Sequence, residues 1–485
     1  MKVQEVKEKT ASATKWSAIT ELVAKFIAPI TNMVLARLLT PEAFGVVATV
    51  TMVVSFADMF TDAGFQKYLM QHDFESRNEL DQHTSVAFWT NIGISLTLWC
   101  IISIFSNQIS AMVGNPGLGN VIIIASLSLP LTSFSSIQMA RFKRDFDFKS
   151  LLFIRIVSSL IPFLVTIPIA LITRSYWALV IGTLVGNAAN AIILTWKSTW
   201  KPQFYYSVSV LKEMFSYSWW ILLETVSIWL TTYIDIFIVG RFLTQYYVGI
   251  YKTSMTTVNQ FMGLITSATS VPLFVALSRL KNDRENLIET YNNYIQAISI
   301  FVIPLGMGMW LYRGLLVDIL LGPQWGEATE FVGLWALMYA ISIVLGTYCN
   351  GLYNAIGKTY LSFASQILQL VVLVPVLLWS VRIDFQHLYV SRSLIRLELV
   401  VAQMIIMRVI LHFPIMKQFA KILPSIVCTA IMAMVSLLLQ RVGDSTVWQF
   451  VSIFICIVTY FAAMLIIYKD MLFRALETLG IRKSR

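Results

Sequence analysis

The stretch RLLTPEAFGVV at residues 37–47 is nearly repeated 204 residues later as RFLTQYYVGIY at residues 241–251. Four positions coincide without a gap, pairing Arg37 with Arg241, Leu39 with Leu243, Thr40 with Thr244 and Gly45 with Gly249. Each copy lies between two apolar segments, which is typical of a short loop that joins two helices. Because recurrence of one loop at a fixed offset indicates an internal repeat, we expect two related halves.

The composition places both halves in a lipid bilayer. Hydrophobic residues make up 57% of the 485 residues, charged residues make up 13%, and the mean hydropathy is +0.72. A transmembrane helix needs about 20 mostly apolar residues, and the chain holds about fourteen such segments. The first is expected at 15–39 and the twelfth at 387–411. The sequence therefore predicts an all-α polytopic membrane protein, and the polar residues 1–14 do not resemble a cleavable signal peptide.

The distribution of basic residues predicts the orientation of the chain. Of the 36 Lys and Arg residues, 25 fall on the side of the N-terminus and six on the opposite side. Cytoplasmic loops carry the excess of positive charge in membrane proteins, so both termini are expected in the cytoplasm. The net charge of +10 then faces anionic lipid head groups, and this distribution argues against a nucleic-acid partner.

Six spans separate the two copies of the repeated loop, so the halves have the same orientation and form parallel repeats. Transporters built this way place their substrate between the repeats near the membrane midplane. The predicted organisation is a cytoplasmic N-terminal segment at 1–14, an N-lobe at 15–197, a cytoplasmic interfacial linker at 198–212, a pseudo-symmetric six-helix C-lobe at 213–412, and an appended helix pair with a basic cytoplasmic tail at 413–485.

Five basic residues remain inside the predicted spans, where each charge costs about 2.5–3.5 kcal/mol on insertion scales. Arg392 and Arg396 share one face of a helix, so they contact either an anionic ligand or carboxylate partners. Lys25 follows Glu21 by four residues and is either a cavity contact or half of an internal ion pair. The remaining two lie near span ends and either face the cavity or extend to the interface: Arg155 and Lys252.

Acidic residues inside the spans suggest a second kind of site. Asp58 and Asp62 are four residues apart, and they form either a proton or sodium coupling site or a set of partners for Lys25 or Arg155. Two further acids are candidates for coupling or charge pairing: Glu224 and Glu398. We find no catalytic motif, nucleotide-binding loop or metal-ligand spacing, so we expect a transporter without a cofactor. Where these acids form a coupling site, a proton or sodium gradient drives transport; where they pair with cations, no such coupling is implied.

Four stretches resemble the polysaccharide transporter family, the flippases of lipid-linked oligosaccharides within the multidrug/oligosaccharidyl-lipid/polysaccharide exporter superfamily. They are EKTASATKWSAI (8–19), LARLLTPEAFGVVATVTMVVSFADMFTDAGF (35–65), FVALSRLKNDRENLIETY (274–291) and LLGPQWGEATEFVGLWAL (320–337). The resemblance is strongest to the branch of lipopolysaccharide, colanic-acid and teichuronic-acid exporters.

This resemblance implies a fourteen-helix fold of two lobes that open alternately to each side of a bacterial cytoplasmic membrane. The implied cargo is an undecaprenyl-pyrophosphate-linked oligosaccharide repeat unit, moved to the outer leaflet through a cationic cavity for cell-surface polysaccharide assembly. Contacts with polysaccharide polymerase machinery are expected. The alternative is a cation-coupled multidrug exporter of the same superfamily.

Overall fold

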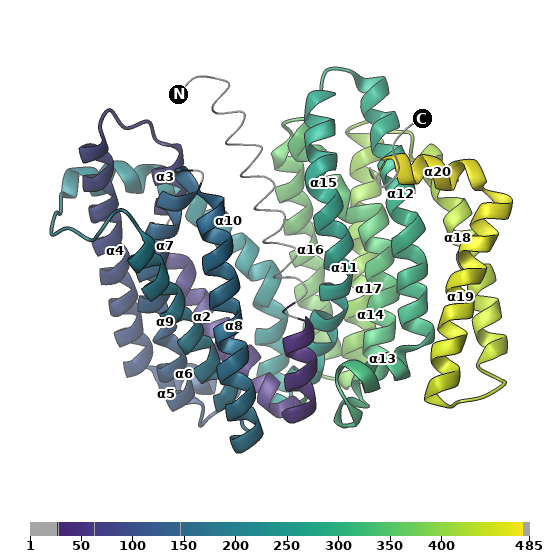
Figure 1. Cartoon of the computed structure of the whole chain (residues 1–485), viewed down its shortest axis with the longest axis horizontal. Coiled ribbons are helices and arrows are strands. Elements are labelled where there is room, and N and C mark those ends of the chain that lie inside the picture. Colours follow the sequence, from purple (N-terminus) through teal and green to yellow (C-terminus); the bar gives the residue numbers. More distant parts are fainter. Residues whose placement is uncertain (1–26, 28, 63, 146, 479–485) are drawn as a thin grey trace. The chain divides into compact units, whose positions relative to one another are not determined.

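The computed structural model describes residues 27, 29–62, 64–145 and 147–478, with the backbone alone at residues 62, 216–224, 271 and 476–478. Every regular element in these ranges is a helix (Figure 1). Among the described residues, 12 helices are long and apolar enough to cross a membrane. The prediction of an all-α polytopic membrane protein is thereby confirmed.

The predicted number of fourteen spans is not reached among these residues, and two of the predicted spans account for the difference. Most of the first predicted span, 15–39, lies outside the described residues. The twelfth is helix α17 (Phe385–Val409), which is 25 residues long. It is too charged to count as an apolar span because Arg392, Arg396 and Glu398 fall in every 18-residue window of the helix.

The chain folds as two compact units that divide between Lys252 and Thr253, inside helix α11 (Gln245–Arg279). Unit 1 contains a helix at residues 29–38, α2 (Pro41–Asp62), α3 (Phe65–Gln71), α4 (Arg77–Ile104), α5 (Ser106–Met112), α6 (Gly119–Ser126), α7 (Ser128–Arg144), α8 (Phe148–Thr173), α9 (Trp177–Lys197), α10 (Val208–Phe242) and the start of α11. The lobe boundaries expected from the repeat stay a prediction.

Unit 2 continues with the rest of α11. Its other helices are α12 (Arg284–Leu311), α13 (Arg313–Leu320), η1 (Pro323–Trp325), α14 (Ala328–Ser342), the π-helical turn η2 (Ile343–Thr347), α15 (Tyr348–Ala355), α16 (Thr359–Ser380), α17, α18 (Ile415–Leu439), α19 (Thr446–Ile467) and α20 (Lys469–Thr478).

Short polar side chains define where several of these helices begin. The side chains of Ser76, Asp147, Asp283 and Asp384 each accept a hydrogen bond from the backbone N–H three residues later, at the starts of α4, α8, α12 and α17. Such capping satisfies one of the N–H groups that have no partner within the first helical turn. The first residues of these four helices are therefore determined by the local sequence, independent of the membrane.

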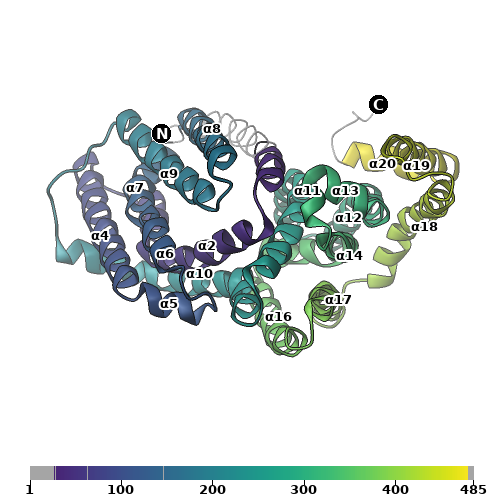
Figure 2. The same cartoon turned by 90° about the horizontal axis from the view of Figure 1, so that it is seen from below.

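Small residues allow close helix packing in unit 1. A Cβ added at Gly182 of α9 would lie 1.8 Å from Thr166 Oγ1, and one added at Gly186 would lie 2.5 Å from Pro162 Cγ, both on α8. Close approach at small residues is a main way in which helices associate in a bilayer. On another side of the unit, α2 lies beside α6 and α10 (Figure 2), so α2 is central to this bundle.

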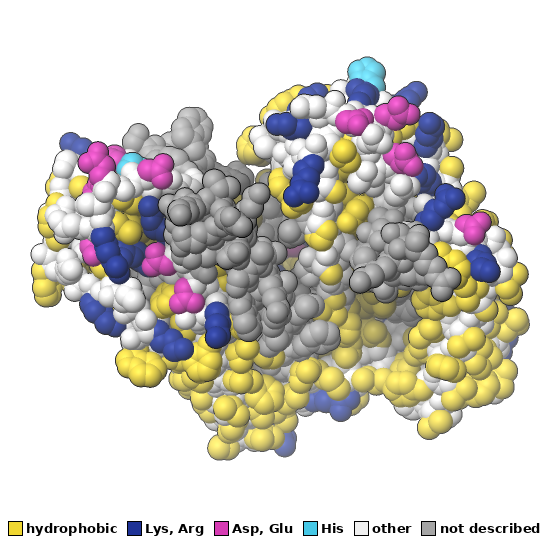
Figure 3. Space-filling model, turned by 45° about the horizontal axis from the view of Figure 1, so that its top comes forward, with side chains coloured by type: hydrophobic (Ala, Val, Ile, Leu, Met, Phe, Trp, Pro, Cys, Tyr) yellow, Lys and Arg dark blue, Asp and Glu magenta, His cyan; other side chains and the backbone are white. Residues whose placement is uncertain are grey.

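Helix α12 occupies the centre of unit 2, where it packs against α14 and α18. Helices α18 and α19 form a hairpin, and α20 crosses its upper end in Figure 1. In the space-filling view, charged side chains gather at the upper end of each unit and hydrophobic side chains cover the surface below them (Figure 3). This division is what a protein that is partly immersed in lipid requires.

Candidate functional site

The two arginines on α17 lie together on one aromatic side chain of α14. The guanidinium carbon of Arg392 is 4.9 Å from the ring centre of Trp335, and that of Arg396 is 4.5 Å from the same ring. Arg396 also lies 4.4 Å from the ring of Tyr339. Cation–π contacts of this kind contribute about 0.5–2 kcal/mol each. The four-residue spacing thus places both cations on one face, as the sequence indicated.

Trp335 belongs to a row of aromatic residues on α14 that we call the aromatic shelf: Phe331, Trp335 and Tyr339. They are four residues apart and therefore share one helix face. The indole of Trp335 is fully buried and its Nε1 donates a hydrogen bond to Asn259 Oδ1 on α11, at 3.1 Å. The ring of Phe331 stacks on Tyr389 of α17 at 5.5 Å. The aromatic shelf is therefore held in place by contacts with both α11 and α17, and its fixed rings orient the two guanidinium groups.

Burial makes the arginine pair chemically distinctive. Arg392 is only 4% exposed, although an arginine is rarely so buried in any protein. A guanidinium stacked on a ring presents its N–H edge outward, and that edge matches the paired oxygens of a phosphate or carboxylate. The arrangement is thus suited to holding an anionic group within a helical membrane unit.

Glu398 is the acid nearest to this pair in sequence, but it does not form an ion pair with either arginine within the described residues. Its Oε2 atom is buried and accepts no hydrogen bond from any described residue. A buried carboxylate in this situation favours a bound proton or cation. Glu398 is therefore a separate titratable group on α17.

In unit 1, Asp58 of α2 is held by hydroxyl groups. Thr132 of α7 donates to Asp58 Oδ1 at 2.9 Å, and Thr61 donates to the same oxygen at 3.2 Å. The described residues contain no ion pair between Asp58 and Arg155, whereas Lys25, the other partner considered, lies outside them. Hydroxyl donors leave the charge of the carboxylate uncompensated, which is compatible with cation or proton binding.

The other predicted site residues are dispersed. Arg155 is exposed on α8 and has no partner among the described residues. Lys252 is half-buried, with its ammonium nitrogen 5.3 Å from the ring centre of Tyr233. Four predicted residues cannot be placed: Lys25 and Glu21 lie outside the described residues, and the side chains of Asp62 and Glu224 do as well.

The structure also reveals a cluster that the sequence did not indicate. His72 and His83 looked unrelated in sequence, yet their rings stack 6.2 Å apart. Their Nε2 atoms lie 3.8 and 3.9 Å from the two carboxylate oxygens of Glu213. Tyr68 donates a hydrogen bond to Glu213 Oε1 at 2.6 Å. Burial and then this hydrogen bond raise the pKa of Tyr68.

This cluster connects α3, α4 and the beginning of α10. The spacing of its members, at positions 68, 72, 83 and 213, contains no motif that would have marked it. The one available signal is the four-residue interval between Tyr68 and His72, whose rings stack at 4.7 Å. The cluster therefore links α3 and α4 to the first residues of α10.

Comparison with known proteins gives consistent results. The family model described as polysaccharide biosynthesis protein matches residues 34–330. An uncharacterized membrane protein in the cps region of Klebsiella pneumoniae is 26% identical over 381 residues, covering 77% of each chain. The succinoglycan biosynthesis transport protein ExoT of Rhizobium meliloti (strain 1021) is 23% identical and covers 69% of this chain and 67% of its own.

Among solved structures, the lipid II flippase MurJ in its inward closed conformation superposes with a TM-score of 0.75. The two share 16% sequence identity, and the match covers 94% of this chain and 99% of MurJ. At this identity the match establishes a common fold only. Because the family model spans more than half of the sequence, the chain belongs to the polysaccharide biosynthesis protein family.

Proposed function

We propose that this protein is a flippase for lipid-linked oligosaccharides. It carries undecaprenyl-pyrophosphate-linked repeat units from the cytoplasmic to the outer leaflet of a bacterial cytoplasmic membrane, by alternating access through a cationic cavity. The product serves cell-surface polysaccharide assembly. The name of ExoT as a transport protein, the name of MurJ as a flippase, and the membership of the family support this class of activity.

The observation that carries the proposal is the arginine pair on the aromatic shelf. A pyrophosphate needs several charge-assisted hydrogen bonds to leave water, each contributing about 1.5–3 kcal/mol. Arg392 and Arg396 supply two guanidinium groups from adjacent turns, and Trp335 holds both. Lys25, Arg155 and Lys252 are proposed to extend this cationic lining along the path of the cargo.

The driving force is proposed to be a proton or sodium gradient, without a cofactor. The proposed coupling groups are Asp58 and Glu398. Among the described residues, Asp58 accepts hydrogen bonds only from hydroxyl groups, and the buried Oε2 of Glu398 accepts none. Asp62 and Glu224 are retained in the same role from the sequence. Both termini are proposed to lie in the cytoplasm, and the polymerase machinery is a proposed partner at the outer side.

The test uses purified full-length protein in proteoliposomes with a fluorescent undecaprenyl-pyrophosphate-linked sugar. Transport is followed as the fraction of the lipid that an impermeant quencher reaches from outside. Arg392→Ala and Arg396→Ala are expected to slow transport roughly tenfold or more at equal incorporation. The matched control is Arg408→Gln, which removes an exposed charge from the same helix. Wild-type rates in both alanine variants would refute the role of the pair.

The buried carboxylate of Glu398 favours one alternative, a cation-coupled multidrug exporter. A drug cation would be neutralised by this acid, and the arginines would oppose its binding. Efflux of ethidium by wild-type proteoliposomes, lost in Glu398→Gln and retained in Arg396→Ala, would establish this alternative. Failure of ethidium efflux together with movement of the labelled lipid would exclude it.

A further inference from the structure

A pocket lined by cationic side chains lies at one end of unit 2 and shares no residue with the arginine pair. Three loops meet there: the one after α11, the one after α15 and the one after α17. They enclose a pocket of 260 Å³. Its lining residues are Lys281, Arg284, Leu287, Leu352, Ile356, Lys358, Ile410, Leu411 and Phe413.

All the charge that lines this pocket is positive. The described lining residues include three cationic side chains, Lys281, Arg284 and Lys358, and no carboxylate. The neighbouring Asp283 is engaged elsewhere: its two oxygens accept hydrogen bonds from the backbone N–H and the side-chain amide of Asn286. Like charges that line one pocket repel one another, so an anionic ligand would stabilise the arrangement.

The three cationic side chains differ in whether hydrogen bonds to described residues hold them in place. The Nη2 atom of Arg284 donates to the carbonyl oxygens of Leu411 and His412, at 2.7 and 3.2 Å, so its guanidinium is fixed across the pocket. The ammonium groups of Lys281 and Lys358 make no hydrogen bond or ion pair with any described residue. Arg284 therefore shapes the pocket, whereas the two lysines are available to a ligand.

The floor of the pocket is apolar. Leu352 is fully buried, and Leu287, Leu411 and Phe413 are nearly so. Ile410, which is 42% exposed, extends the apolar lining to the surface of the unit. A small soluble phosphate would use only the cations. An apolar floor beside them fits a molecule that has a phosphate and a hydrocarbon portion joined together.

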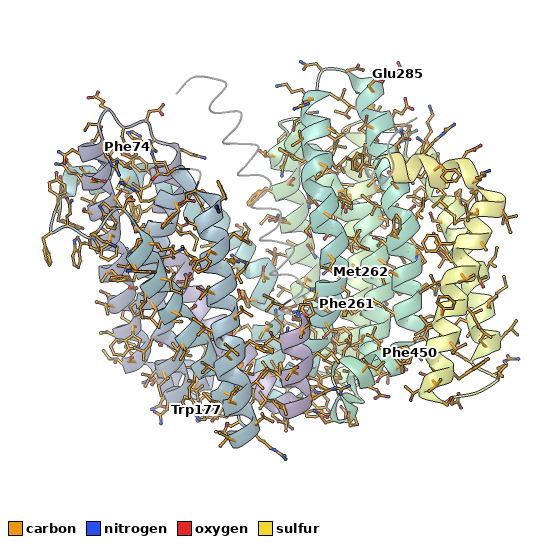
Figure 4. All side chains as sticks on the ribbon, in the orientation of Figure 1. Phe74, Trp177, Phe261, Met262, Glu285 and Phe450 are labelled. Atoms are coloured by element: carbon orange, nitrogen blue, oxygen red, sulfur yellow. The ribbon has the colours of Figure 1, made fainter. Side chains whose placement is uncertain are left out.

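The position of the pocket matches the level of a lipid head group. Lys281 follows the candidate span that ends at Arg279, Arg284 begins the next span, and Lys358 lies between the spans that end at Ala355 and begin at Thr359. Figure 4 labels Glu285, the neighbour of Arg284, at the upper end of α12, with Phe450 toward the opposite end of unit 2. That upper end carries most of the charged side chains in Figure 3.

We propose that this pocket binds an anionic phospholipid of the surrounding membrane, with the phosphate between Lys281, Arg284 and Lys358 and the start of an acyl chain against Ile410, the exposed apolar residue of the lining. The bound lipid is a resident of the bilayer rather than the transported cargo. The site does not depend on the proposed flippase activity, because it shares no residue with the arginine pair or the aromatic shelf.

The experiment measures lipid binding to the purified full-length chain in neutral detergent. Phosphatidylglycerol or phosphatidylcholine is added at increasing concentration, and bound lipid is counted by native mass spectrometry while thermal unfolding is followed in parallel. We expect phosphatidylglycerol to bind more tightly and to raise the Tm, since a ligand that binds only the folded state stabilises it. Equal effects of the two lipids would overturn the proposal.

The variants isolate the pocket. Lys281→Gln with Lys358→Gln is expected to weaken phosphatidylglycerol binding roughly tenfold or more, because each basic group near a lipid surface contributes substantially to attraction. The matched control, Arg279→Gln with Lys417→Gln, removes two exposed charges of unit 2 that lie outside the pocket and is expected to bind normally. Equal loss in both double variants would indicate diffuse attraction and contradict a defined site.

A charge-preserving double variant and a competition with inorganic phosphate complete the test. Lys281→Arg with Lys358→Arg preserves the charge and is expected to retain binding, which separates loss of a ligand from loss of the fold. Inorganic phosphate is expected neither to compete with phosphatidylglycerol nor to raise the Tm at the same concentration. If inorganic phosphate replaced the lipid fully, the pocket would be a site for soluble phosphates and the lipid assignment would be wrong.

Discussion

Gly45 of α2 and Gly249 of α11 contact each other, and they occupy the same position in the two copies of the repeated stretch. A Cβ added at Gly45 would lie 1.9 Å from the carbonyl oxygen of Gln245, and one added at Gly249 would lie 1.8 Å from that of Pro41. Pro41 and Gln245 are also equivalent positions in the two copies. Such reciprocal contacts are what a local two-fold relationship between similar segments produces.

Alanine at either glycine is expected to destabilise the protein by about 1–3 kcal/mol, because the added methyl group meets backbone rather than a movable side chain. The measurement is thermal unfolding in detergent for Gly45→Ala, Gly249→Ala and the double variant. The double variant should cost less than the sum of the two, since the first substitution already separates the helices. Gly93→Ala is the control, because a Cβ added there meets no atom of a neighbouring helix within 4 Å. Equal Tm values in all four proteins would contradict the packing.

Removing the aromatic shelf should impair transport without removing a charge. Trp335→Leu deletes the ring beneath both arginines and is expected to reduce the transport rate about 3- to 30-fold, in line with a cation–π contribution of about 0.5–2 kcal/mol. Trp335→Phe should retain more activity than Trp335→Leu. Trp379→Leu, at a tryptophan that is 60% exposed in the same unit, should transport normally. A rate for Trp335→Leu equal to that of this control would exclude the shelf from function.

The cap of α17 should make stability depend on pH. Asp384 accepts hydrogen bonds from the backbone N–H and the ring Nδ1 of His387, at 2.6 and 2.8 Å, and these lower the pKa of Asp384 below 3.8. A lowered pKa contributes stability that is complete above the unfolded value and is lost as pH falls through the folded value. The Tm of wild type should therefore decrease more than that of Asp384→Asn as pH falls below about 4.

Asn at position 384 is the informative variant because it caps a helix nearly as well as Asp but does not titrate. Asp384→Ala should have a lower Tm than both proteins at neutral pH. If the wild type and Asp384→Asn lost stability in parallel over the acidic range, another group would be responsible for the acid sensitivity.

Loss of the hydrogen bond between Tyr68 and Glu213 should destabilise unit 1. Tyr68→Phe is expected to lower the free energy of unfolding by about 1.5–3 kcal/mol, the usual contribution of a hydrogen bond to a charged acceptor. The control is Tyr360→Phe, at a phenol ring that is 60% exposed. An unchanged Tm in Tyr68→Phe would contradict a stabilising role of the cluster.

The same cluster predicts a loss of stability at alkaline pH. Because the pKa of Tyr68 is raised above 10.0, the neutral phenol contributes stability that is complete below about pH 10 and is lost as pH rises through the higher folded value. The wild type should thus lose its advantage over Tyr68→Phe above that pH. A difference between the two proteins that grows with pH would have the wrong sign.

Local periodicity explains what could be predicted from the sequence. Arg392 and Arg396 had to share a face because a helix turns once in 3.6 residues, and the burial of Arg392 agrees with the apolar residues around it. The class of the fold followed in the same way from the length of the apolar segments. Each of these inferences needs only residues within one helix.

Contacts between distant segments could not be predicted in this way. Trp335 precedes Arg392 by 57 residues, and no local pattern shows that α14 faces α17. Likewise, no pattern within one helix shows that the carboxylate of Asp58 accepts a hydrogen bond from Thr132 of α7. His72 and His83 meet only because the chain reverses between α3 and α4. Side-chain type suggests which partners are suitable, but tertiary packing decides which are present.

The π-helical turn η2, at Ile343–Thr347, lies between the shelf on α14 and the polar end of the same span. One additional residue in a turn rotates everything beyond it by about 100° relative to an uninterrupted α-helix. Beyond this turn, the residues that face the interior of the unit are therefore not those that a continuous α-helix would place there. One of them is Tyr348, whose hydroxyl oxygen lies 2.6 Å from that of Thr269 on α11 and shares a hydrogen bond with it. Removing one residue from this turn would leave the span nearly as long but would point its second half toward the wrong neighbours.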